Sequence, residues 1–150
     1  MESNEDKERN ISELVERYRV CWEVWPDYTF VRGEKRLTGF SLELSGTHEP
    51  GVEHYEPGCE HCVPVYKALQ AIASHIIPQE SRPSRYEVSI FDSAIHYTRK
   101  RRNRPEISLT IKIVHRNGFE QPVDECQSKC LTEMEKNLKA LGAFEGEWHP

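Results

Sequence analysis

The chain has 150 residues and a formal net charge of −5 at pH 7, with 30% of its residues charged. This length suits one domain with its own core, and the negative charge makes nucleic acid an unexpected partner. No apolar run approaches the roughly 20 residues that span a bilayer, so we expect no membrane contact.

The first half of the chain predicts a helix followed by a hairpin. We expect residues 1–9 to form a disordered tail and residues 10–150 to form a single α+β domain. From Asn10 onward, apolar residues recur at helical spacing. Residues 20–31 and 37–46 then alternate with period two, around a turn at Arg32-Gly33-Glu34.

The second half repeats this order with a helix, a hairpin and a last helix. Helical spacing returns at about residues 60–77 and ends before Pro78. Two further strands are predicted at residues 84–98 and 105–116. The last helix is expected at about residues 122–141, with Gly142 suited to the position after its C-cap.

The predicted order is therefore α-β-β-α-β-β-α. Two hairpins, each followed by a helix, favour an antiparallel sheet with helices on one face, which is a two-layer α+β sandwich. The order of the strands within the sheet does not follow from the pattern.

Residues 48–62, HEPGVEHYEPGCEHC, contain the most unusual composition in the chain. They are rich in histidine, cysteine and glutamate and have no apolar periodicity. Zinc prefers four cysteine or histidine ligands in a tetrahedral arrangement. We therefore predict a small metal-binding protein whose metal, zinc by its ligand chemistry, is held by His48, His54, Cys59 and Cys62.

Two other interpretations of this segment remain open. Cys59 and Cys62 form a C-x-x-C pair at the start of a predicted helix, where the helix dipole stabilises a thiolate. This local pattern resembles the redox motif of thioredoxin-like oxidoreductases, which implies Cys59 as the attacking thiol and Cys62 as the resolving thiol. Alternatively, the cysteines simply pack, and the histidines and glutamates are solvated.

The remaining cysteines are Cys21, Cys126 and Cys130. An odd count of five thiols and no export signal favour a reducing cytoplasm over a disulfide framework. Cys126 and Cys130 lie four residues apart on the last predicted helix. We expect both to be buried core thiols, although they would complete the metal site if this helix lay beside the loop.

The link between the last two predicted strands is strongly basic. It suggests a non-catalytic interaction or regulatory module in which an Arg-rich hairpin contacts a polyanion; the residues would be Arg99, Lys100, Arg101, Arg102 and Arg104. The simpler interpretation is a solvated hairpin tip that blocks edge pairing.

The remaining features leave enzymatic activity undecided. Asp92 and His96 would share one side of a regular strand, and His115 lies near another strand end. No motif of a nucleotide-binding or hydrolytic site is present. The aromatic residues of the first strand are expected to be mostly core, with Trp25 on the opposite side of the strand; they are Trp22, Trp25, Tyr28 and Phe30.

Overall fold

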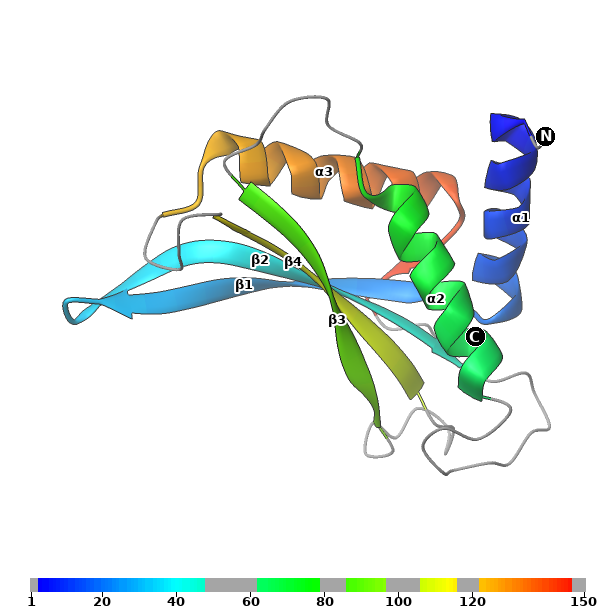
Figure 1. Cartoon of the computed structure of the whole chain (residues 1–150), viewed down its shortest axis with the longest axis horizontal. Coiled ribbons are helices and arrows are strands. Elements are labelled where there is room, and N and C mark those ends of the chain that lie inside the picture. Colours follow the sequence, from blue (N-terminus) through cyan, green and yellow to red (C-terminus); the bar gives the residue numbers. More distant parts are fainter. Residues whose placement is uncertain (1–2, 48–61, 79–85, 97–105, 116–121, 147–150) are drawn as a thin grey trace.

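The computed structural model describes residues 3–47, 62–78, 86–96, 106–115 and 122–146 (Figure 1). Helices and strands alternate in groups, which confirms the α+β class. The elements are α1 (Asn4–Arg17), β1 (Cys21–Val31), β2 (Glu34–Thr47), α2 (Cys62–Ile76), β3 (Tyr86–His96), β4 (Glu106–His115), α3 (Glu125–Ala140) and β5 (Phe144–Glu145).

Within the described residues, the strands form one sheet in the order β3-β4-β2-β1-β5. The hairpins β1–β2 and β3–β4 are antiparallel, and β2 joins them by pairing antiparallel with β4. The two predicted hairpins are therefore antiparallel as expected, but the sheet as a whole is mixed, because β5 pairs parallel to β1. Two residues of the tail are enough for this pairing, since the backbone N–H of Phe144 donates to Val20 O.

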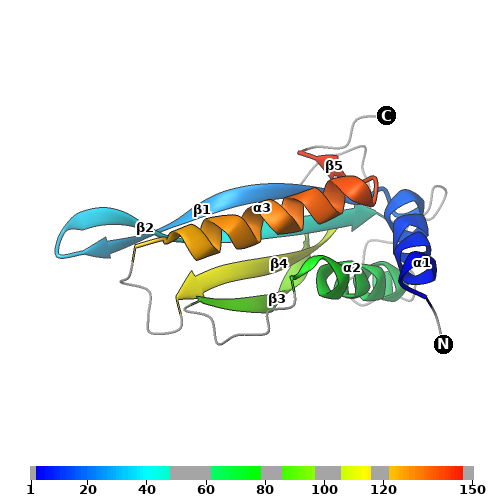
Figure 2. The same ribbon diagram turned by 90° about the horizontal axis from the view of Figure 1, so that it is seen from above.

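One face of the sheet carries the core. Leu42 and Leu44 of β2 lie opposite Ile111 and Leu109 of β4, and all four are fully buried. Figures 1 and 2 show α2 and α3 lying over the sheet, and their buried side chains join this cluster. Helix α1 packs against α2 at one end. The core therefore lies between the strands and the helices.

Helix α1 begins earlier than its apolar pattern suggested. It starts at Asn4 rather than Asn10, so residues 4–9 are helical and not a disordered tail. The Ser3 side chain accepts a hydrogen bond from the backbone N–H of Asp6, and acidic residues in the first turn suit the positive end of the helix dipole. These polar features support a helical turn that has no apolar face.

Helix α3 is fixed to the sheet at its first turn. Asp124 and Gln127 form a capping box, in which each side chain accepts from the other's backbone N–H. The Gln127 side chain is fully buried, and its amide donates to Thr38 O and Ile113 O at 3.4 and 3.3 Å. The cap therefore bridges β2 and β4.

Candidate functional site

The proposed metal ligands fall in the segment between β2 and α2. His48, His54 and Cys59 lie outside the described residues, and Cys62 is the first residue of α2, with its side chain outside the described part. Elsewhere in the described chain, no group of three or more His, Cys, Asp or Glu residues is placed to hold a metal ion. The cysteine–histidine site therefore stays a prediction.

The two elements that flank this segment are held against each other. A Cβ atom on Gly46 would lie 3.1 Å from Val65 Cγ1 and 3.5 Å from Leu69 Cδ2. Val65 and Leu69 are fully buried. The next residue, Thr47, donates its backbone N–H to Tyr18 O at 2.9 Å. The end of β2 and the first turns of α2 thus pack together and form a frame at the two ends of the segment.

Two buried hydroxyl groups lie near the same end of the sheet. Thr47 Oγ1 and Ser108 Oγ have no hydrogen-bond partner among the described residues. Ser108 is fully buried and pairs across the ladder with Ser45, which is also buried. Buried hydroxyls normally have a partner, so each of these groups bears a desolvation cost.

The cysteines of α3 are placed at the other end of β2. Gln127, between Cys126 and Cys130, contacts Thr38, whereas the start of α2 contacts Gly46. These positions are eight residues apart in β2, about 26 Å at 3.3 Å per residue. Cys126 and Cys130 therefore cannot share a metal with Cys62.

Of the two thiols on α3 that were predicted to be buried, one is buried and one is exposed. Cys130 is buried, with its Sγ 3.9 Å from Met134 Sδ, so this prediction is confirmed. Cys126 is exposed, and the prediction for it is wrong. The apolar stripe of α3 begins only at Cys130, because Cys126 stands in the first turn and Gln127 fills the buried position there.

The strand histidines are placed far apart. His96 pairs with Glu106 at one end of the β3–β4 ladder, and His115 pairs with Tyr86 at the other end. They cannot act together. The register also shifts between Asp92 and Ile95, so the regular alternation that favoured an Asp92–His96 pair does not hold.

The Arg-rich link, residues 99–104, lies outside the described residues.

The aromatic residues of β1 divide differently from the prediction. Trp22 is buried, and its Nε1–H donates to Glu135 Oε2 at 3.2 Å. Trp25 is exposed, as expected for the other side of the strand, but Tyr28 and Phe30 are also exposed. The prediction that most of these residues are core is wrong, because the hairpin β1–β2 extends past the helices (Figure 1).

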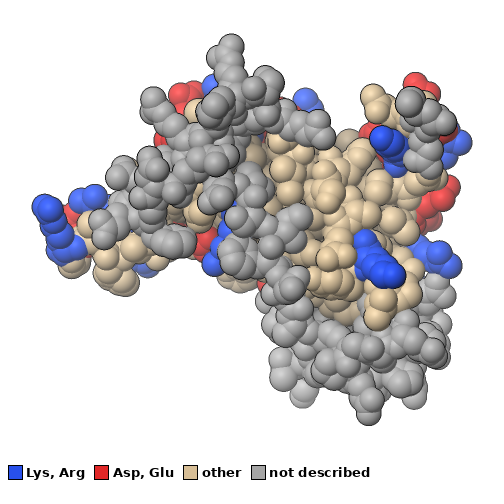
Figure 3. All heavy atoms as spheres, viewed as in Figure 1, with Lys and Arg blue, Asp and Glu red and all other residues tan. Residues whose placement is uncertain are grey.

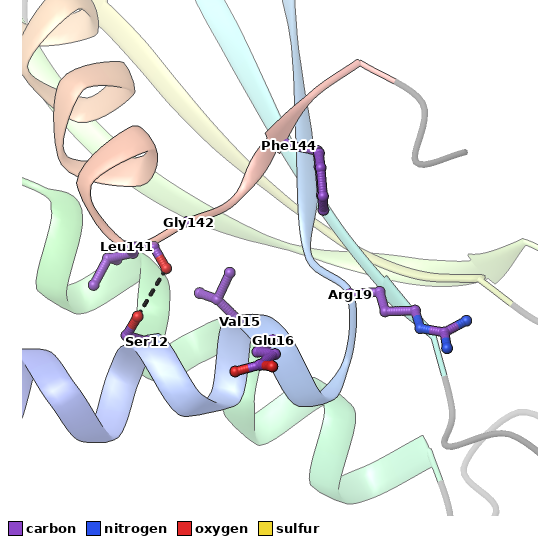
Figure 4. A pocket seen from close by; sticks show the side chains of 7 residues that line it. All are labelled: Ser12, Val15, Glu16, Arg19, Leu141, Gly142 and Phe144. Atoms are coloured by element: carbon purple, nitrogen blue, oxygen red, sulfur yellow. Dashed lines mark hydrogen bonds between the residues drawn. The ribbon is translucent and has the colours of Figure 1, made fainter. Parts of the chain in front are cut away.

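A pocket of about 400 Å³ lies where the C-terminal ends of α1 and α3 meet β5 (Figure 4). The Ser12 hydroxyl at its edge already donates to Leu141 O at 2.9 Å. The remaining lining is Val15, Glu16, Arg19, Gly142 and Phe144. The pocket is open, and no polar side chain that lines it is buried. It therefore lacks the enclosed polar groups typical of a specific ligand site.

Comparisons with known proteins assign no family. No protein-family model, no curated protein and no solved structure matches this chain. None of the described helices is long and apolar enough to cross a membrane.

Proposed function

We propose that this protein binds one zinc ion through His48, His54, Cys59 and Cys62. The proposal rests on the ligand chemistry of the segment, since thiolate and imidazole are the donors that zinc prefers. With four protein ligands the site would be closed and structural. If one histidine did not bind, water would take the open position and metal-assisted chemistry would become possible.

The structural observation that supports the proposal is the close approach of Gly46 to Val65. It brings together the residues next to both ends of the segment, so the entropy of closing this loop is met before metal binds. The same proposal includes two further features. The domain is a two-layer sandwich with all its helices on one face. The protein works in a reducing cytoplasm, which keeps its thiols free.

Metal content of the purified protein tests this function. Protein prepared without chelator should contain about one equivalent of zinc by mass spectrometry. Cys59→Ser and Cys62→Ser should each lose most of it. Cys126→Ser is the matched control, because this cysteine is exposed and lies at the opposite end of β2; it should keep the metal. Less than about a tenth of an equivalent in the wild type would refute the proposal.

A second candidate function is thiol–disulfide exchange at Cys59 and Cys62. It is favoured by the position of Cys62 as the first residue of α2, whose first turn contains no acidic residue. A helix N-terminus stabilises a thiolate. A metal-free protein that forms a Cys59–Cys62 disulfide, reducible near the cytosolic potential, would favour this function over zinc binding.

A further inference from the structure

The outer part of the hairpin β1–β2 is a two-stranded ribbon. Pairing of β2 with β4 begins only at Gly39, and β5 pairs only with Cys21 and Trp22. Among the described residues no third strand pairs with residues 28–37, although Val123 donates its backbone N–H to Leu37 O at the base. Figures 1 and 2 show this part extending away from the helices. We call residues 28–37 the arm.

The arm exposes two aromatic rings on one side. Tyr28 and Phe30 are 49% and 72% exposed. They lie two residues apart in β1 and so on the same side of the strand, about 6.8 Å from each other along it. Trp25, at the base of the arm, is also half exposed but points to the other side of the strand. Large aromatic side chains are usually buried, so such a group indicates a contact surface.

One cation lies against these rings and two more are close in the chain. Lys35 lies across the ladder from Phe30, and its Nζ is 4.3 Å from the centroid of the Tyr28 ring. Arg32 is in the turn and Arg36 follows Lys35. The arm thus has three cations and one carboxylate, Glu34, in a chain whose net charge is −5. Figure 3 shows Lys and Arg atoms gathered at the tip of this projection.

We propose that the arm binds single-stranded nucleic acid. Unpaired bases stack on exposed aromatic rings, and nearby lysines and arginines contact the phosphates. The acidic net charge argued against nucleic acid at the sequence level, but the charge is unevenly distributed, and the arm is locally basic. The proposal does not depend on the proposed zinc site, because the segment that would hold zinc follows the opposite end of β2 in the chain.

The turn at the tip supports a role for Arg32. Arg32 and Gly33 have φ of 52° and 83°, as in the two-residue hairpin turns that favour Asn-Gly. Arginine is unfavourable with positive φ. Its presence there places a cation at the tip of the arm at the expense of backbone strain, which is typical of functional positions.

Two other partners fit the arm less well. Insertion into a membrane would carry the charged tip, Arg32-Gly33-Glu34, into the bilayer before either aromatic ring. Addition of a partner's strand along β1 is hindered by Pro26, which has no N–H, and by the register shift between Asp27 and Tyr28. The exposed rings also favour unpaired bases over a duplex, in which the bases are already stacked.

Fluorescence anisotropy with labelled DNA and RNA strands of mixed sequence tests the proposal. Both single strands should bind at low salt, at least about tenfold more tightly than the matching duplex. Tyr28→Leu and Phe30→Leu keep an apolar side chain but remove the ring; each should weaken binding roughly 5- to 100-fold. Phe144→Leu is the control, since this exposed phenylalanine lies on β5.

Charge variants complete the experiment. Lys35→Gln should weaken binding and make it less sensitive to salt, whereas Lys129→Gln, an exposed lysine on α3, should change neither. Circular dichroism should show that every variant remains folded. No binding at about 100 µM protein, equal affinity for duplex, or binding indifferent to the Tyr28 and Phe30 variants would each overturn the proposal. Selective binding to anionic vesicles would identify a membrane partner instead and also overturn it.

Discussion

At the scale of single residues, α1 and α3 end in the same way with different residues. The backbone N–H groups of Arg19 and Val20 bond to Glu16 O and Val15 O, and those of Gly142 and Ala143 bond to Lys139 O and Leu138 O. Both patterns are Schellman motifs, which need a residue in the left-handed conformation after the C-cap. Gly142 meets this need without strain, but Arg19 meets it with φ of 52°.

Arg19→Gly should therefore be more stable than Arg19→Ala by about 1 kcal/mol, because both lose the same side-chain contacts and only alanine keeps the backbone strain. Chemical denaturation measures the difference. Gly142→Ala makes the opposite change at the equivalent position of α3 and serves as the control. Nothing lies within 4 Å of the added Cβ, so the expected loss of about 1 kcal/mol in the free energy of unfolding is also a backbone effect. Equal stability of the two Arg19 variants would show that this turn is not strained.

At the scale of elements, the sequence predicted what local periodicity determines. The alternation of Ile107, Leu109, Ile111 and Ile113 correctly marked β4, and all four are buried. Gly142 correctly marked the end of α3. These predictions are confirmed because each depends on neighbours along the chain.

Features that depend on distant partners were missed. The exposure of Tyr28 and Phe30 follows from where α3 begins, which their own alternation does not encode. The strand β5 depends on backbone bonds to β1 and is too short to show a pattern. For the candidate site, the sequence identified ligand types, whereas the frame made by Gly46 and Val65 is a contact between elements.

The junction of α3 with the sheet depends on Gln127. Gln127→Met keeps a similar volume but removes the amide that donates to Thr38 O and Ile113 O and completes the capping box. We expect a loss of about 2–3 kcal/mol in the free energy of unfolding, because two carbonyl groups lose a donor in a buried site. Thr132→Val, at an exposed hydroxyl of the same helix, should change stability by less than about 0.5 kcal/mol.

Gln127→Glu tests the same junction through pH. Burial and the two carbonyl oxygens would raise the pKa of a glutamate at this position above its value in the unfolded chain. The unfolded state then binds fewer protons than the folded state, so stability is lost as pH rises through the folded pKa. The difference in the free energy of unfolding between wild type and variant should be smaller at pH 4 than at about pH 8. A difference independent of pH would contradict a buried, carbonyl-facing position.

At the scale of the whole molecule, the described residues build a core of their own, and we expect it to fold without the proposed metal. The described buried side chains of α1, α2, α3 and the sheet already form one continuous cluster. A domain of this length buries about 70% of the surface of its unfolded chain. The proposed zinc ion would thus add to a fold that is already stable, in contrast to small zinc fingers, which unfold without metal.

Removal of metal should therefore lower the stability of the protein without unfolding it. Zinc at about a thousand times its dissociation constant adds about 4 kcal/mol, which for 150 residues corresponds to roughly 10 °C in Tm. After dialysis against chelator, circular dichroism should show a cooperative transition shifted down by about this amount and restored by zinc. His54→Ala should show a much smaller response to zinc, and Cys126→Ser the full response. A chelated protein that is unfolded at 25 °C would show that the metal, and not the core, holds this domain together.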